Sequence, residues 1–124
     1  MTADNYTRRV RIERIIDGDT VVAGAIDLGY HVQTTAGIEY RLLRCNAPES
    51  NRPASRAAGL VAKQYTVDWL LEHVAHDPDG WLYATTQKTD SFGRFLAEIV
   101  CGQGHDLSDD LLTSGNAVPY KRQG

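Results

Sequence analysis

The feature that most limits how this chain can fold is a long amphipathic segment at its centre. Apolar residues recur there at intervals of three and four, a spacing that predicts one helix over residues 55–74. The repeating positions are Ala58, Val61, Ala62, Tyr65 and Trp69, and the stripe is widened by Leu60, Val67, Leu70, Leu71 and Val74. The rest of the chain must therefore be arranged around one helix of roughly 20 residues, about 30 Å long.

Three strands are predicted before this helix. Apolar and charged residues alternate over residues 8–16, which indicates a strand with one buried face. The next pair, Asp17-Gly18, is typical of a two-residue type I′ hairpin turn, so a second strand should begin at Asp19 or Thr20. After another turn, residues 38–45 are predicted to form a third strand, which completes a meander.

Two further strands and a short helix are predicted after the long helix. Residues 81–87 and 94–101 are rich in aromatic and β-branched side chains, as strands are. Asp106 or Ser108 can cap a short helix, and Gly115 stands where its C-terminal cap belongs. We therefore expect a chain order of three strands, a helix, two strands and a second helix.

This order predicts the fold class and the domain organisation. Five strands with a helix between the third and the fourth are the layout of the OB-fold, a five-stranded Greek-key β-barrel, so the chain should be mainly β with helices. A chain of 124 residues suits one domain. We expect a flexible N-terminal tail over residues 1–7 and a single domain over residues 8–121.

Composition excludes several classes of protein. No apolar run approaches the roughly 20 residues that span a bilayer, and no secretory signal pattern opens the chain, so we expect a cytoplasmic protein that does not enter a membrane. A compact barrel is expected to be a monomer. The net charge of −3 argues against a broad basic surface for nucleic acid. A polyanion would have to be bound locally, by a few arginines and a metal ion.

Three separate stretches supply charged residues that together suit phosphodiester chemistry. They are residues 15–22 with two aspartates, 41–50 with an arginine and a glutamate, and 89–94 with a second arginine. Each charge alone would ordinarily be a solvated surface group. Placed together, two guanidinium groups and a carboxylate can position a phosphate and stabilise the charge that develops during its hydrolysis.

The chain resembles the thermonuclease family, the calcium-dependent staphylococcal or micrococcal type of nuclease built on an OB-fold. Four motifs carry the resemblance: Ile-Asp-Gly-Asp-Thr-Val at 16–21, Arg-Leu-Leu-x-x-x-x-Pro-Glu at 41–49, Thr-Asp-x-Phe-Gly-Arg at 89–94, and Leu-Leu-x-x-Gly-x-Ala-x-x-Tyr at 111–120. The resemblance implies a hydrolase that cleaves phosphodiester bonds of DNA and RNA with low sequence specificity, and hence a nucleic acid substrate.

The resemblance also implies the residues of a catalytic and substrate-binding site. Glu49 stands where the family has its general base, and Arg41 and Arg94 stand where it has two phosphate-binding arginines. Phe92 and Tyr120 can contact the substrate by stacking on a base. Phe92 departs from the family, which often has a tyrosine there.

A calcium site is implied at three positions. Asp19 stands where the family has a calcium-binding carboxylate, Asn46 where it has a second one, and Ala47 where it has a backbone carbonyl ligand. An amide in place of a carboxylate should weaken calcium binding, because affinity depends on the number of charged ligands. Asp17 could supply the missing charge.

Three functions therefore stay open at this point. The first is a metal-dependent nuclease. The second is a nucleic-acid-binding OB domain in which Asn46 has impaired catalysis, and the third is a protein-interaction module with a relic cleft. Cleavage separates the first from the other two, and retardation of nucleic acid in a gel separates the second from the third.

Overall fold

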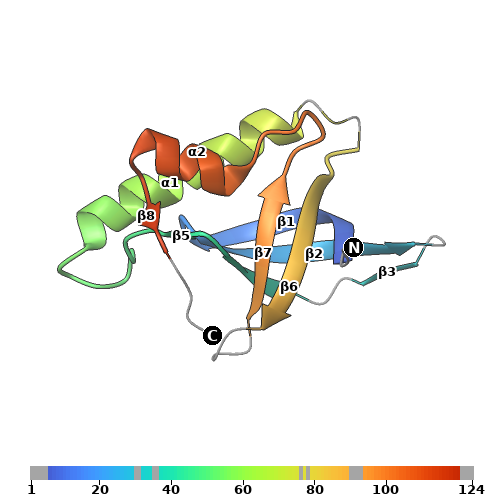
Figure 1. The fold of residues 1–124 in the computed structure, drawn as a ribbon, viewed down its shortest axis with the longest axis horizontal. Coiled ribbons are helices and arrows are strands. Elements are labelled where there is room, and N and C mark those ends of the chain that lie inside the picture. Colours follow the sequence, from blue (N-terminus) through green and yellow to red (C-terminus); the bar gives the residue numbers. More distant parts are fainter. Residues whose placement is uncertain are drawn as a thin grey trace.

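The computed structural model describes residues 6–29, 32–34, 37–75, 77, 79–89 and 94–120. Figure 1 shows its elements, which in chain order are β1 (Tyr6–Asp17), β2 (Thr20–Gly29), β3 (Val32–Thr34), β4 (Ile38–Leu42), β5 (Cys45–Asn46), α1 (Arg56–Val74), β6 (Leu82–Thr89), β7 (Phe95–Val100), α2 (Leu107–Ser114) and β8 (Val118–Pro119). Residues 1–5 of the predicted N-terminal tail lie outside this description, and β1 begins at Tyr6.

The strands form the predicted barrel. The main sheet has the order β1-β6-β7-β4-β2-β3, and β1 also pairs with β2. The barrel is therefore closed by β1, β6, β7, β4 and β2, while β3 continues the sheet beyond β2. The pairing of β4 with β7 is parallel and the other pairings are antiparallel, as in a mixed barrel. The prediction of a five-stranded OB-fold with two helices is confirmed.

The first hairpin forms, but its turn differs from the predicted one. Asp17 pairs with Thr20, so the turn residues are Gly18 and Asp19. A type I′ turn needs a positive φ at both central residues, and Gly18 has none. The prediction of that turn type was wrong. Gly18 is needed for space instead, because a Cβ there would lie 3.0 Å from the Cβ and the carbonyl oxygen of Ala62 on α1.

The third strand is shorter than predicted. Residues 38–42 pair within the barrel, and the chain then bends so that β5 leaves it to pair with β8, with Cys45 opposite Pro119 and Asn46 opposite Val118. Hydrogen bonds hold the chain on either side of the bend. Before it, the Leu42 amide donates to the Asp19 carbonyl at 2.8 Å, and after it, β5 pairs with β8. The C-terminal segment is thereby brought beside the residues that follow β4.

The long helix forms as predicted, but it buries a narrower face. Its buried residues are Gly59, Ala62, Thr66, Trp69, Leu70 and His73. Four members of the predicted stripe are instead exposed: Ala58, Leu60 by 49%, Val61 by 62% and Leu71 by 68%. The prediction was wrong for these four, which lie outside the face that carries Gly59, Ala62 and Thr66.

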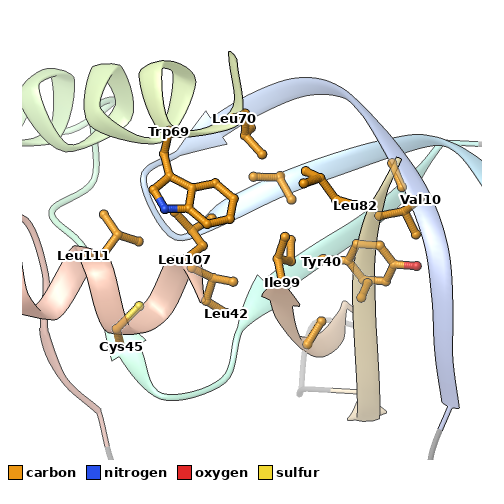
Figure 2. Close-up of a cluster of buried hydrophobic side chains, with 14 of the residues drawn as sticks. Val10, Tyr40, Leu42, Cys45, Trp69, Leu70, Leu82, Ile99, Leu107 and Leu111 are labelled. Atoms are coloured by element: carbon orange, nitrogen blue, oxygen red, sulfur yellow. The ribbon is translucent and has the colours of Figure 1, made fainter. Parts of the chain in front are cut away.

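One continuous cluster of buried side chains fills the core, as Figure 2 shows. The barrel is filled by Val10, Tyr40, Leu82 and Ile99, whereas the space between the helices and the end of the barrel is filled by Trp69, Leu107, Leu111 and Cys45.

The short helix α2 begins after Asp106, whose side chain accepts from the Asp109 amide, and ends at Gly115 with φ of 81°. Both predicted caps are confirmed. None of the described helices has the length and apolar character needed to cross a membrane.

Candidate active site

A buried ion pair between Asp19 and Arg41 lies at the centre of the site. The pairing of β2 with β4 places Arg41 directly opposite Thr20, one residue beyond the hairpin turn that carries Asp19. Arg41 Nη1 lies 3.1 Å from Asp19 Oδ2, and the two side chains are exposed by only 7% and 6%. Two charges are thus removed from water together, which is tolerated only when their remaining hydrogen bonds are satisfied.

The guanidinium group of Arg41 is held by several acceptors besides Asp19. Its Nη1 donates to the carbonyl oxygens of Leu42 at 3.0 Å and of Cys45 at 2.9 Å. Its Nη2 donates to Asn46 Oδ1 at 2.8 Å. Because the bend after β4 supplies these acceptors, the shape of this loop and the orientation of Arg41 determine each other.

The carboxylate of Asp19, like the guanidinium group of Arg41, is held by hydrogen bonds within the protein. Its Oδ2 accepts from the Ala47 amide at 2.7 Å, and its Oδ1 accepts from the Thr20 hydroxyl at 2.9 Å. Asp19, Arg41, Asn46 and Ala47, which sequence analysis assigned to one site, therefore contact one another in one network.

The C-terminal segment adds an aromatic side chain to this network. The ring centroid of Tyr120 lies 5.8 Å from the guanidinium carbon of Arg41, within reach of a cation–π interaction. The Tyr120 amide donates to the carbonyl of Arg44 at 3.0 Å, which holds the residue beside the bend. The side chain is partly exposed, so one side of the Arg41 region is bordered by an accessible ring.

Glu49 lies on the loop that follows this network, and its surroundings are different. The next residue, Ser50, donates to Asp17 Oδ1 from its amide at 2.9 Å and from its hydroxyl at 2.7 Å. The carbonyl of Glu49 accepts from the Ser55 hydroxyl at 2.7 Å. The Glu49 carboxylate itself is 48% exposed and forms an ion pair with Arg52. The backbone of the loop is fixed, and the carboxylate faces solvent.

Arg52 is a residue that sequence reasoning missed. It stands three positions after Glu49, a spacing that allows an ion pair within one turn of chain. This spacing is the feature of the sequence that could have predicted the pair. Asp17, considered above as a substitute metal ligand, instead binds Ser50 with one of its oxygens.

Strand alternation places Arg94 on the same face of the sheet as Arg41. Arg41 is opposite Leu96 in the parallel pairing of β4 with β7, so Arg94 precedes that partner by two residues, about 6.6 Å along the chain. Its Nε lies 3.7 Å from Oε2 of Glu39, which alternates onto the face of Arg41. Phe92, the remaining predicted site residue, lies outside the described residues.

Comparison with known proteins identifies the family of this chain. A family model described as staphylococcal nuclease homologue matches residues 39–124, more than half of the chain. The chain belongs to the staphylococcal nuclease homologue family. No curated protein matches it. In this staphylococcal nuclease homologue the matched part contains Arg41, Glu49 and Arg94, whereas Asp19 precedes it and reaches the site through the β2–β4 pairing.

The calcium ligands expected from the sequence give this site one carboxylate, on Asp19, and one amide, on Asn46. Calcium takes six to eight oxygen ligands, commonly with several carboxylates. Among the described residues no group of three or more His, Cys, Asp or Glu side chains could hold a metal ion. Asp19 Oδ2 pairs with Arg41 and Asn46 Oδ1 accepts from it, so the positive charge of Arg41 balances the one carboxylate of this set. A calcium requirement therefore stays a prediction.

Proposed function

We propose that this chain is a nuclease that hydrolyses phosphodiester bonds of DNA and RNA with low sequence specificity. The observation that carries the proposal is the fixed guanidinium group of Arg41, buried beside Asp19 and next to the loop that bears Glu49. A cation held by backbone carbonyls does not need to reorganise when negative charge develops on a phosphate. Membership of the nuclease family supports the same conclusion.

The proposed reaction uses three side chains. Glu49 accepts a proton from a water molecule, the water oxygen forms a bond to phosphorus, and the bond from phosphorus to the 5′ oxygen breaks as the leaving 5′ oxygen takes a proton from solvent. Arg41 and Arg94 neutralise the additional charge on the phosphate oxygens, a task for which the planar guanidinium group is suited. Every step is carried by these residues, and none is assigned to a metal ion.

The chemistry of the loop supports Glu49 as the base. Its carboxylate is accessible to water, while Ser55 fixes its carbonyl and Ser50 binds Asp17. Arg52 pairs with the carboxylate in the absence of substrate. A substrate phosphate would compete for Arg52 and release Glu49 towards water. Tyr120, beside Arg41, is proposed to contact the substrate, because its ring is partly accessible.

Product chemistry tests the proposal. The protein should shorten single-stranded DNA and RNA, and breaking the bond to the 5′ oxygen should leave 5′-hydroxyl and 3′-phosphate ends. Fragments that polynucleotide kinase labels without prior phosphatase treatment are expected. Intact nucleic acid after prolonged incubation over a range of calcium concentrations would contradict the proposal, and fragments with 5′-phosphate ends would contradict the proposed bond.

A second candidate is a nucleic-acid-binding domain that does not cleave. The amide at Asn46 and the saturated hydrogen bonding of Asp19 favour it, since both reduce the capacity for a metal ion. It predicts DNA that is retarded in a gel but never shortened. A domain that binds only proteins predicts neither effect.

A further inference from the structure

The first turns of α1 approach the loop of Glu49 unusually closely. A Cβ at Gly59 would lie 2.6 Å from the carbonyl carbon and oxygen of Glu49 and from the amide nitrogen of Ser50. These are backbone atoms, so they cannot turn away as the end of a flexible side chain can. Glycine is therefore required at position 59 for the helix and the Glu49–Ser50 peptide to remain in contact.

Hydrogen bonds through Ser55 also connect α1 to the Glu49–Ser50 peptide. The hydroxyl of Ser55 donates to the carbonyl of Glu49 at 2.7 Å, and the amide of Gly59 donates to the carbonyl of Ser55 at 2.7 Å. Ser55 stands at the N-cap position of α1, yet its side chain makes no cap hydrogen bond to the helix. Its hydroxyl is used to hold Glu49 instead.

One turn further along, α1 contacts the hairpin that carries Asp19. Gly18 meets Ala62 closely enough that a Cβ would lie 3.0 Å from its side chain, and the carbonyl of Gly18 accepts from the hydroxyl of Thr66 at 2.6 Å. The Thr66 side chain is fully buried, so this bond is shielded from water. A single rigid helix thus touches the residues adjacent to both Glu49 and Asp19.

We propose that Gly59 is a positioning residue for cleavage, and that Gly59, Ala62 and Thr66 set the separation between the Glu49 loop and the Asp19 turn. This inference rests on the proposed nuclease function. It follows from the contacts above, because neither segment can move along α1 without a clash at Gly59 or the loss of the Thr66 bond. Displacements of about 1 Å can reduce a rate by about 10²-fold when the reacting groups must be aligned.

The decisive variant is Gly59→Ala. The added methyl group must push the Glu49–Ser50 peptide away, while the higher helix propensity of alanine favours α1 and so helps the variant to fold. We expect kcat to fall by about 10²-fold and KM to stay within about twofold, because alignment is lost and phosphate binding is not. A merely structural role would lower the melting temperature without this separation of kcat from KM.

Gly102→Ala is the matched control. A Cβ at Gly102 would have its nearest neighbour at 3.9 Å, on the side chain of Tyr83, and Gly102 is not among the glycines with positive φ. We expect this variant to keep the kcat and KM of the parent protein. A folded Gly59→Ala variant with the parental kcat would overturn the proposal.

Two further measurements keep the inference testable in other circumstances. If Gly59→Ala does not fold, Ser55→Ala removes the bond to the Glu49 carbonyl without adding atoms, and kcat should fall about tenfold at constant KM. An unchanged kcat would overturn the proposal.

If the parent protein does not cleave nucleic acid, the proposed function fails, but amide chemical shifts still decide the geometry. Gly59→Ala should move the signals of Glu49, Ser50 and Gly18, and shifts confined to α1 would contradict the inference.

Discussion

The two halves of the candidate site are built in opposite ways. Arg41 and Asp19 are almost fully buried, and hydrogen bonds and an ion pair within the protein hold both side chains. Glu49 exposes 48% of its side chain, whose carboxylate pairs with the exposed Arg52, while its backbone is held by Ser55 and by the contact with Gly59. The cationic half is thus part of the folded core, whereas the carboxylate half rests on its surface.

This difference teaches which changes separate catalysis from stability. A buried ion pair is costly to break, because the remaining charge is left without its partner in a region of low dielectric constant. An exposed carboxylate can be neutralised with little effect on folding. Substitutions in the Arg41 half should therefore alter both properties, and substitutions at Glu49 should alter cleavage alone.

The largest effect is expected for Arg41→Ala. Removing the guanidinium group leaves Asp19 buried and unpaired and frees the carbonyls of Leu42 and Cys45, so the free energy of unfolding should fall by about 3–5 kcal/mol. Cleavage should be lost as well. Urea unfolding followed by circular dichroism measures the first effect, and Arg52→Ala is an exposed control. A variant as stable as the parent protein would show that the pair is not integral to the fold.

Arg94→Ala should affect cleavage more than stability. Arg94 is about a quarter exposed, and its ion pair with Glu39 is long, with 3.7 Å between Nε and Oε2. Loss of one charge-stabilising donor should reduce cleavage of single-stranded DNA by about 10²–10³-fold. The unfolding midpoint in urea should change little. Parental cleavage rates in this variant would remove Arg94 from the proposed mechanism.

Asn46→Asp adds a negative charge at the solvent-exposed edge of the Arg41 network. The new carboxylate would share Arg41 with Asp19 and would supply a second charged ligand for a hard cation. We expect the calcium concentration that gives half-maximal cleavage to fall on the order of tenfold. Asn51→Asp, an exposed asparagine on the same loop, is the control for charge alone. An unchanged calcium titration would show that residue 46 does not limit metal binding.

The smallest effect concerns Cys45, whose carbonyl binds Arg41. Burial, followed by the nearby charge of Asp19, raises the pKa of the Cys45 thiol to about 11 from its ordinary value of 9.0. The unfolded chain then loses this proton before the folded chain does, so stability falls as pH rises from about 9 to about 11. Urea midpoints measured across this range should fall less steeply for Cys45→Ala. Parallel curves would contradict the assignment.

Much of the fold could be predicted from local patterns. Alternating residues and the Asp-Gly pair predict the first hairpin, and Asp106 and Gly115 predict the limits of α2. What could not be predicted depends on contacts between distant segments. A Cβ at Gly18 would lie 3.0 Å from Ala62 on the distant helix α1, and β5 pairs with β8 instead of extending β4.

The structure brings several of the predicted site residues together in an arrangement that the sequence did not predict. Motif spacing identified Arg41 and Glu49, yet it says nothing about burial. The deep placement of Arg41 follows from its pairing with β2 and from the carbonyls of the following bend. The pairing of Glu49 with Arg52, and the contact of its loop with Gly59, required the three-dimensional path of the chain.

The most direct test of the account is the single-turnover cleavage rate of Glu49→Gln on labelled single-stranded DNA, measured together with its urea unfolding curve. The account predicts a rate lower by about 10²–10⁴-fold and an unfolding free energy within about 0.5 kcal/mol of the parent protein. A variant that cleaves as fast as the parent protein would contradict it.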